Sequence, residues 1–337
     1  MTYKVQKSNK FAVFIVLTGL ITSLLFATSA SSASAATTFK PVTIDVCGEK
    51  VLFKAPPKRV FSYDVNMLEY LVALGLERKI VAAWVYSQDT ADELTPDFKA
   101  RLAAAGVKVT VGKYPEMEPI LNTKADFMFA GYNYGLRVGG EVNTKSLRAQ
   151  GVKTYILKES CRHVNPGLGR SNMEDVYFDL RSLGAIFGVQ KRANELISEY
   201  KKTIKLARSK VPAGAKPVSL FLYDSGEESP FTAGTFAIPT EMFRLAGGKN
   251  VIQNVPKTWT EVSWESVIAA NPEVMPVVTY GGYSCNDRIK TLATIPGLGS
   301  ITAIKNKQHP CFVYAEIVPG IRTADATLRL ASLLWDK

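Results

Sequence analysis

Several side chains able to transfer protons follow two apolar runs of the chain. General acid–base catalysis needs such groups where a reacting molecule can be held. Ser62 and Ser225 lie beside them as possible nucleophiles, but no histidine is placed to activate a serine. An enzyme is therefore an alternative that the sequence leaves open. The candidate carboxylates are Asp64, Asp224, Glu227 and Glu228.

Metal and thiol chemistry is weakly represented in the chain. The sequence holds four cysteines and two histidines, His163 and His309, and no C-x-x-C motif. A zinc cluster or a Cys-His catalytic pair is not indicated by this pattern, and we predict no metal site formed by protein ligands alone.

Four cysteines allow three disulfide connectivities. We favour the pairing in which each bridge stays within one half of the chain, because one cysteine of the second half follows a predicted strand and the other opens one. Export, which is argued below, permits such bridges. The favoured pairs are Cys47 with Cys161 and Cys285 with Cys311.

Two segments of the chain match each other position by position. From Glu118 the sequence reads E-P-I-L-N-T-K-A-D-F-M, and from Glu265 it reads E-S-V-I-A-A-N-P-E-V-M. Upstream of each lies an apolar run that ends in Tyr-Asp, at residues 59–64 and 219–224. The same order in both halves indicates a weak internal duplication.

The elements that must position these residues alternate between strand and helix. Such alternation predicts mainly parallel sheets covered by helices. A long charged helical pattern follows a Gly188-Val189 joint and ends before Pro212 and Gly214. We expect strands near 60–64, 80–84, 107–111, 126–131, 153–157, 218–223, 274–279 and 311–314, and helices near 66–75, 96–105, 116–123, 142–150, 172–187, 189–210 and 323–335.

The expected fold class is α/β, with two lobes joined by one long α-helix. With 337 residues, 47% of them hydrophobic, the chain is long enough for two buried cores. The expected domains are a signal peptide at 1–35, an N-terminal α/β lobe at 41–188, a linking helix at 189–212 and a C-terminal α/β lobe at 217–337.

The first 35 residues have the pattern of a cleavable secretory signal. Three lysines precede an apolar run of 17 residues, and a Ser/Ala tract ends in Ala33-Ser34-Ala35. No cysteine stands at the expected cut near Ala35, so we expect a free periplasmic protein rather than a lipoprotein; a retained membrane anchor is the alternative. Removal of the three lysines lowers the net charge from +11 to +8. A basic surface or an anion-collecting cleft would explain this charge, whereas export argues against nucleic acid as a partner.

The chain resembles the substrate-binding proteins of ABC importers for ferric siderophores, haem and cobalamin. The resemblance covers about residues 41–335, and it rests on the order of several motifs rather than on one. These are P-P-K-R-V-F-S (56–62), M-x-x-Y-L-V-A-L-G-L (67–76), A-D-F-M-F-A-G (125–131), S-P-F-T-A-G (229–234), A-G-G-K-N-V-I (246–252) and W-T-E-V-S-W-E-S-V (259–267).

The resemblance implies roles for the two matched glutamates and for the cleft. In the family, one glutamate on the tip of each lobe docks into arginine pockets of the two permease subunits, and by motif these are Glu118 and Glu265. The simpler alternative is that each carboxylate only stabilises a helix N-terminus. The resemblance further implies a binding protein without cofactor or catalysis, and we expect a monomer that partners with permease subunits.

The ligand is expected between the lobes, beyond the carboxyl ends of the strands. Aromatic side chains gather at these strand ends and suit a large, partly flat ligand, and arginines can hold carboxylate or catecholate oxygens. The nominated residues are Tyr63, Trp84, Tyr86, Tyr132, Tyr134 and Arg137 in the first lobe, and Tyr223, Trp259, Tyr280, Tyr283 and Arg322 in the second.

A basic cleft with arginines favours an anionic ferric siderophore as the ligand, that is, a metal chelate of small size. Cobalamin is an alternative that needs aromatic contacts without surplus positive charge. Haem is another, for which His163 could supply an axial ligand, although a lone loop histidine is more often structural. A directly bound zinc or manganese ion is disfavoured, since no histidine-rich site exists. A scaffold protein without transport is a further alternative.

Overall fold

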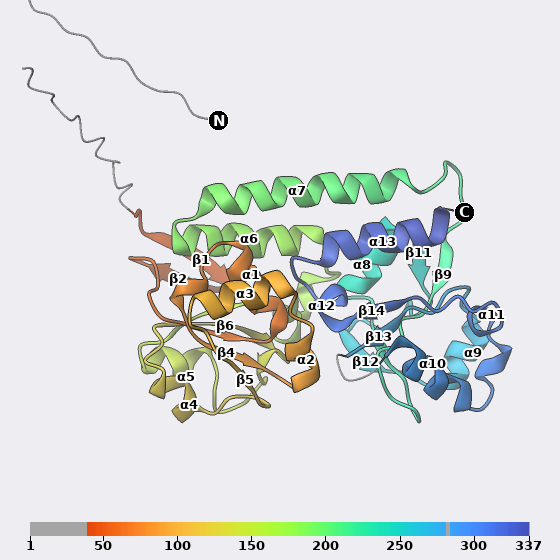
Figure 1. Cartoon of the computed structure of the whole chain (residues 1–337), viewed down its shortest axis with the longest axis horizontal. Coiled ribbons are helices and arrows are strands. Elements are labelled where there is room, and N and C mark those ends of the chain that lie inside the picture. Colours follow the sequence, from red (N-terminus) through yellow and green to blue (C-terminus); the bar gives the residue numbers. More distant parts are fainter. Residues whose placement is uncertain (1–38, 281–283, 337) are drawn as a thin grey trace, which may run out of the picture. The chain divides into compact units, whose positions relative to one another are not determined.

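A parallel sheet of six strands forms the centre of the first lobe in the computed structural model, which describes residues 39–280 and 284–336 (Figure 1). The strand order is β5-β4-β3-β6-β7, and β8 also pairs with β6. Its strands are β3 (Val60–Tyr63), β4 (Ile80–Val85), β5 (Val109–Val111), β6 (Phe127–Tyr132), β7 (Gly135–Leu136) and β8 (Lys153–Ile156). β3 is buried along its whole length, as expected for a central strand covered on both faces.

Helices follow the strands of this sheet as the alternation predicts. They are α1 (Val65–Ala73), α2 (Gln88–Asp92), α3 (Pro96–Ala104), α4 (Met117–Asn122) and α5 (Thr144–Ala149), with short 3₁₀ turns η1 (Glu77–Lys79), η2 (Glu159–His163) and η3 (Pro166–Leu168). Thr95 caps α3, whose first residue is Pro96, and Asn143 caps α5 in a capping box. These local signals fix where each helix begins.

A hairpin not expected from the sequence precedes the sheet. Strands β1 (Val42–Val46) and β2 (Glu49–Phe53) pair antiparallel around a turn at Cys47 and Gly48. Both turn residues have positive φ, 54° and 96°, as a type I′ hairpin turn requires. Cysteine is uncommon at such a position, so the turn carries no sequence signal of the Asn-Gly kind.

The second lobe has a narrower parallel core. β11 (Gly248–Asn250) pairs with β9 (Val218–Leu220), β13 (Val277–Thr279) pairs with β14 (Cys311–Val313), and isolated parallel bridges at Leu220–Val274 and Tyr223–Val277 join the two pairs. Pro276 has no amide hydrogen and cannot donate to a ladder. The longer strands expected at 218–223 and 274–279 are therefore shortened.

The remaining elements of this lobe lie around that core. An antiparallel pair consists of β10 (Phe231–Ala233) and β12 (Trp259–Glu261). The helices are α8 (Ile238–Leu245), α9 (Trp264–Ala270), α10 (Cys285–Thr294), α11 (Thr302–Lys305), α12 (Tyr314–Ile317) and α13 (Thr323–Trp335), with one 3₁₀ turn, η4 (Leu298–Ser300).

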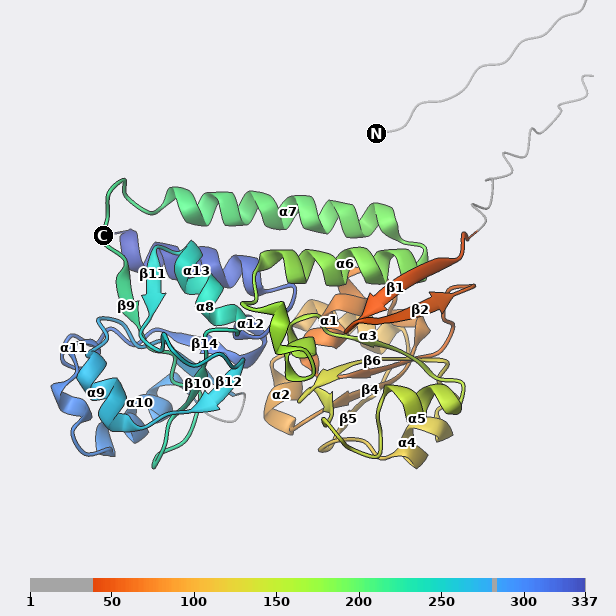
Figure 2. The ribbon, with the colours of Figure 1, turned by 180° about the vertical axis from the view of Figure 1, so that it is seen from behind.

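A long helix runs along both lobes. α6 (Met173–Phe187) ends at Gly188, whose φ of 73° stops the helix, and α7 (Gln190–Ser209) begins two residues later. The 20 residues of α7 span about 30 Å. α7 packs against α6 of the first lobe and α13 of the second, as Figures 1 and 2 show from opposite sides.

The structure gives the internal duplication a physical basis. Asp126 accepts hydrogen bonds from the backbone N–H groups of Lys58 and Arg59, just before β3. The matching Glu273 accepts from the backbone and hydroxyl of Ser219, in β9. Each carboxylate thus anchors the start of the strand that leads to a Tyr-Asp pair. The residues six positions after the two matched glutamates, Lys124 and Asn271, both have positive φ, 54° and 43°.

Both disulfides have the pairing predicted from the sequence. Cys47 is bridged to Cys161 and Cys285 to Cys311, with Cα–Cα distances of 5.0 and 5.8 Å. The first ties the β1–β2 turn to η2, and the second ties the start of α10 to β14. Each bridge therefore lies within one lobe.

Candidate functional site

A cavity of about 590 Å³ lies where the strand ends of the two lobes meet. Most of its lining residues follow β3, β4, β5 and β6 in the first lobe and β9, β13 and β14 in the second, the position at which open α/β sheets bind ligands, whereas Phe231 and Trp259 belong to the antiparallel pair β10 and β12. The lining residues are Tyr63, Asp64, Tyr86, Ser87, Thr90, Tyr114, Asn133, Tyr134, Asp224, Ser225, Phe231, Trp259, Tyr280 and Tyr314.

Five of the residues nominated from the sequence line this cavity. They are Tyr63, Tyr86, Tyr134, Trp259 and Tyr280. Tyr114 and Tyr314 were not nominated, although each follows a strand that the pattern predicted. Tyr314 comes directly after β14 and Tyr114 three residues after β5, so the rule that found Tyr63 could have found both.

The other nominated residues have different surroundings. The indole of Trp84 donates to the carbonyls of Gly112 and Lys113 at 2.9 and 3.0 Å and stacks on Phe61, so it supports a loop. Tyr223 is buried in the second core beside Trp264. Tyr132 is half-buried at the end of β6, outside the lining set. Tyr283 lies outside the described residues.

Neither nominated arginine lines the cavity. Arg137 is exposed, lies over the Tyr114 ring at 4.4 Å, and lines a separate hollow of about 520 Å³ next to Glu118. Arg322, at the start of α13, forms a bidentate ion pair with the buried carboxylate of Glu69 in α1. The lining of this cavity, as far as the structure describes it, holds no Lys or Arg side chain.

Tyr63 is held against the backbone at the bottom of the cavity. A Cβ at Gly135, whose φ is 93°, would come within 2.5 Å of the Tyr63 ring, so only glycine permits this approach. The ring also stacks on Tyr114 with a centroid distance of 6.2 Å. Its hydroxyl is buried and has no hydrogen-bond partner among the described residues, so it is available to a ligand.

Asp64 follows Tyr63 in an unusual backbone conformation. Its φ is 70° and its ψ 157°, a region that non-glycine residues rarely adopt and that is typical of functional sites. The buried carboxylate accepts from the backbone N–H of Val65 at 2.7 Å and from the hydroxyl of Tyr314 at 2.9 Å. Burial raises the pKa of Asp64 to about 6, and the two donors oppose this rise.

Asp224 has an equivalent arrangement in the second lobe. It accepts from the hydroxyl of Tyr280 at 2.7 Å and from the hydroxyl of Ser225 at 2.8 Å. Burial raises the pKa of Asp224 as well. The rings of Tyr280 and Tyr314 stack with a centroid distance of 5.6 Å, so the two Tyr–Asp pairs are in contact.

Trp259 closes another side of the cavity. Its indole N–H donates to the hydroxyl of Tyr134 at 3.2 Å, and its ring stacks on Phe231 at 6.0 Å. Tyr134 belongs to the first lobe and Trp259 to the second, so the bond crosses between the lobes. Nearby, Nε2 of His163 is 3.1 Å from the hydroxyl of Thr258, and burial lowers the pKa of this histidine.

Further carboxylates of the first lobe accept hydrogen bonds from the second. Glu93 accepts from the backbone N–H groups of Tyr314 and Ala315 at 3.3 and 2.7 Å, and Glu159 from that of Ile238 at 2.6 Å. Burial raises the pKa of Glu93 and of Glu159 to about 8 each. Together with Asp64 and Glu69, they are buried carboxylates through which the two lobes contact each other.

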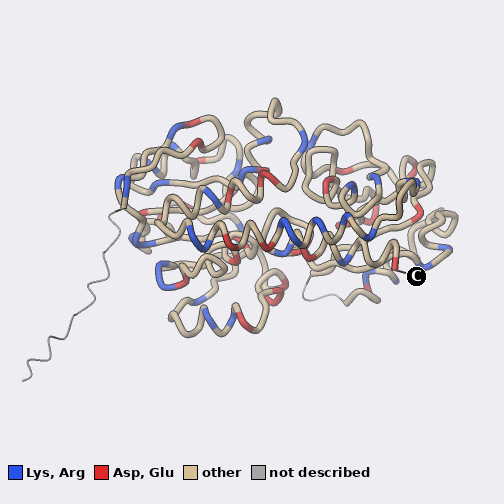
Figure 3. Tube along the Cα trace, turned by 90° about the horizontal axis from the view of Figure 1, so that it is seen from above, with Lys and Arg blue, Asp and Glu red and all other residues tan. Residues whose placement is uncertain are grey.

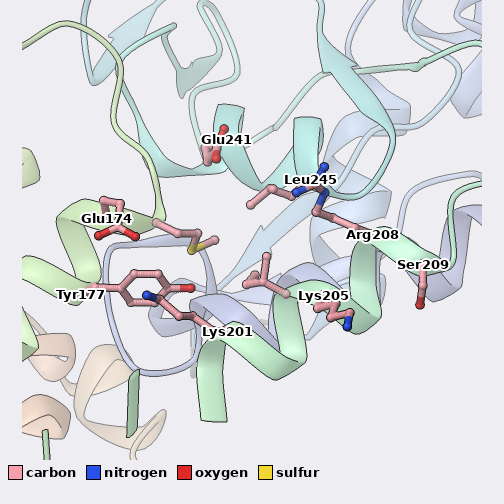
Figure 4. A pocket seen from close by; sticks show the side chains of 10 residues that line it. Glu174, Tyr177, Lys201, Lys205, Arg208, Ser209, Glu241 and Leu245 are labelled. Atoms are coloured by element: carbon pink, nitrogen blue, oxygen red, sulfur yellow. The ribbon is translucent and has the colours of Figure 1, made fainter. Parts of the chain in front are cut away.

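A second hollow, of about 560 Å³, lies between α6, α7 and α8 (Figure 4). Three of its charged residues have partners: Lys201 lies 5.3 Å from the Tyr177 ring, Glu241 pairs with Arg244 at 2.6 Å, and Glu174 pairs with Arg181 at 3.2 Å. Seen from above, Lys and Arg positions are interspersed with Asp and Glu positions along the chain trace (Figure 3). No residue nominated from the sequence lines this hollow.

The described part of the chain has neither a cluster of metal-ligating side chains nor a helix suited to span a membrane. Among residues 39–280 and 284–336, no group of three or more His, Cys, Asp or Glu side chains could hold a metal ion. No helix in the same part of the chain is long and apolar enough to cross a membrane.

Most of the chain matches one known protein family. The model of the family described as periplasmic binding protein matches residues 60–309, which is most of the chain. The chain belongs to the periplasmic binding protein family. It is therefore a substrate-binding protein of the ABC-importer type rather than an enzyme, with a small-molecule ligand and permease partners.

Individual members of this family are similar over most of their length. A curated relative, the uncharacterized ABC transporter substrate-binding lipoprotein YvrC of Bacillus subtilis, is 23% identical over 279 residues, which are 82% of this chain and 79% of YvrC. A periplasmic binding protein from Veillonella parvula is 29% identical with a TM-score of 0.74 and covers 88% of this chain and 98% of its own.

A second solved structure shares the fold at lower identity. It comes from an ABC-type Fe³⁺-hydroxamate transport system of Saccharomonospora viridis, is 20% identical with a TM-score of 0.74, and covers 88% of this chain and 99% of its own. Together these neighbours establish the α/β fold with a parallel central sheet and two lobes.

The comparison with YvrC corrects the expected localisation. YvrC is a lipoprotein, which is a membrane-anchored binding protein, and this contradicts the prediction of a free periplasmic protein without a lipid anchor. The prediction relied on the lack of a cysteine near Ala35. That observation concerns lipid attachment at one position only and does not address membrane retention in general. Residues 1–38 lie outside the described residues.

Proposed function

We propose that this binding protein captures a ferric siderophore in the cavity between its lobes and delivers it to an ABC importer permease. The observation that carries the proposal is the cavity of about 590 Å³, lined by six tyrosines, one tryptophan and one phenylalanine from both lobes. Rigid aromatic rings give wide contact at low entropic cost, which suits a bulky chelate. The similar protein of Saccharomonospora viridis belongs to a system described as transporting Fe³⁺-hydroxamate.

A corrinoid such as cobalamin is the second candidate. The cavity lining that the structure describes contains no Lys, Arg or His, which suits a ligand without acidic groups. Haem fits less well, because its two propionates would meet no cation among the described lining residues. The buried hydroxyl of Tyr63 could still approach a metal, so haem is kept as an outcome of the experiment below.

Docking on the permease is proposed for Glu118 and Glu265. Both are exposed, and each is the second residue of its helix, α4 or α9. Figures 1 and 2 place both helices on the side of the protein away from α7. Two like charges at matched positions of duplicated lobes suit two similar pockets on a permease dimer, where charge complementarity sets orientation.

The ligand class can be tested on protein purified from its own host without unfolding. An absorbance scan and native mass spectrometry are expected to show a ferric chelate band and the corresponding mass. Absorbance bands of a corrin or of haem would instead identify cobalamin or haem as the ligand. Protein unfolded in urea and refolded is the control, since it must lose the band and regain it only with the matching ligand. Absence of any chelate, together with no binding of added ones, would overturn the proposed function.

A further inference from the structure

We propose that the cavity selects its ligand by charge, and that it binds neutral or cationic chelates and rejects anionic ones. This inference rests on the proposed function and narrows it, since it favours hydroxamate-type ferric chelates over tris-catecholate or carboxylate types. It also reverses the expectation of an anionic ligand drawn from the net charge of the chain. The net charge of the chain does not say where the charged side chains lie, whereas the lining residues show which charges face the cavity.

The charged groups that line the cavity are both acidic. Asp64 comes from the first lobe and Asp224 from the second, and each is only 4% exposed. No Lys, Arg or His stands among the lining residues that the structure describes. In sequence, residues 281–283 read G-G-Y and add no charge. An anionic ligand would therefore meet two like charges and no counterion.

Two arginines contact residues that line the cavity but do not line it themselves. Arg288 donates to the backbone carbonyls of Val278 and Asp224 and lies over the Tyr223 ring at 5.1 Å. Arg137 lies over the Tyr114 ring, on the side of the neighbouring hollow. Two nitrogens of Arg288 are engaged in these hydrogen bonds, and neither guanidinium is among the residues that line the cavity.

The tyrosines strengthen the same preference. Tyr280 and Tyr314 donate their hydroxyl hydrogens to the two aspartates, so their phenol oxygens are left as acceptors toward the cavity. The faces of the rings carry partial negative charge, and aromatic groups with nearby carboxylates attract cations. A chelate with amine or amide N–H groups on its surface would find acceptors here.

The experiment compares three ferric chelates by calorimetry: a neutral trihydroxamate, a trihydroxamate bearing one ammonium group, and a tris-catecholate of charge minus three. The neutral and cationic chelates are expected to bind at least about tenfold more tightly than the anionic one, because like-charge contact is costly in a partly desolvated site. Equal or tighter binding of the anionic chelate would overturn the inference while leaving the proposed function intact.

A pair of variants tests the carboxylates themselves. Asp224→Asn keeps an oxygen for the Tyr280 hydroxyl but removes the charge, and it is expected to reduce the advantage of the cationic over the neutral chelate by about threefold or more. Glu174→Gln, on the exposed face of α6, is the matched control and should leave this ratio unchanged. An unchanged ratio in Asp224→Asn would count against the inference.

A metal-free pair of probes separates the inference from the proposed function. Phenyltrimethylammonium and benzenesulfonate are similar in size and opposite in charge. If no ferric chelate binds, the proposed function fails, but preferential binding of the ammonium probe would still support charge selection. Preference for the sulfonate, equal binding, or binding of neither probe would overturn it.

Discussion

The hydroxyl of Tyr314 donates to the carboxylate of Asp64 at 2.9 Å, and this bond joins the second lobe to the first inside the cavity. Tyr314→Phe would remove the donor and keep the ring that stacks on Tyr280. Because a hydrogen bond to a charged group contributes about 1.5–3 kcal/mol, we expect a loss of that order in the free energy of unfolding.

Urea unfolding at pH 7.5 would measure this change. Tyr86→Phe is the matched control, because Tyr86 is 47% exposed and its hydroxyl makes no hydrogen bond to the described residues. Equal stability of the Tyr314→Phe and Tyr86→Phe variants would show that the bond between Tyr314 and Asp64 does not hold the lobes.

Arg322 is predicted to matter for stability more than for ligand contact. Arg322→Met leaves the buried carboxylate of Glu69 without its partner, which typically costs about 3–5 kcal/mol. The double variant Glu69→Met with Arg322→Met removes both charges, and we expect it to recover much of that loss. Melting temperatures of the three proteins would measure the effect. If Arg322→Met kept normal stability but lost ligand binding, Arg322 would instead be a ligand contact, as the sequence predicts.

Several elements were predictable because their signals are local. β3 and α13 begin and end within about two residues of the expected ranges, since their apolar runs are bounded by charged residues, Pro or Gly. Gly188 marks the end of α6 for the same reason. The β1–β2 hairpin was missed, because its Cys47-Gly48 turn lacks the usual residues.

The site was only partly predictable because contacts distant in sequence decide it. Trp84 and Tyr63 both stand at the ends of neighbouring strands, yet only the Tyr63 ring reaches the cavity, while Trp84 binds the loop at Gly112. Arg322 and Glu69 are 253 residues apart, and nothing local in either segment announces their pairing. The position of a strand end was thus predictable, but the direction of its side chain was not.

Stability is expected to fall as the pH rises from about 5 to 8.5. The carboxyl of Glu93 has its pKa raised from 4.5 to about 8 by burial, so the folded protein keeps a proton that the unfolded chain has lost. This contribution is complete below about pH 4.5 and is lost as the pH rises through 8. Glu159, also raised to about 8, acts in the same direction.

Glu93→Gln tests this pH dependence. The amide oxygen can keep the 2.7 Å bond from the backbone of Ala315, but the group no longer titrates. The difference in melting temperature between pH 5 and pH 8.5 should be smaller in this variant than in the native protein. Glu228→Gln, at an exposed position, should not alter the difference. If the two variants behave alike, Glu93 does not contribute to it.

Gly135→Ala is predicted to weaken ligand binding by displacing Tyr63. The added Cβ would lie 2.5 Å from the Tyr63 ring, and the positive φ of 93° adds backbone strain. We expect at least about a tenfold loss of affinity for the chelate, since a well-packed ring must move. Gly139→Ala is the control, because it has a similar φ of 75° but open space around it. Equal affinity of both variants would show that the position of Tyr63 is not needed.

The two matched glutamates give the last prediction. Glu118→Lys and Glu265→Lys should each impair uptake and permease-stimulated ATP hydrolysis, because a cation would face a basic pocket of the permease. Contact between like charges costs several kcal/mol, and each loss of about 1.4 kcal/mol weakens binding tenfold. Affinity of the isolated protein for the chelate should stay unchanged, since neither residue lines the cavity. The double variant should be at least as impaired as either single one. Glu116→Lys, also exposed and directly before α4, is the control for added charge alone. Normal uptake by both variants would show that the matched glutamates do not dock on the permease. They would then only stabilise two helix N-termini that derive from one duplicated lobe.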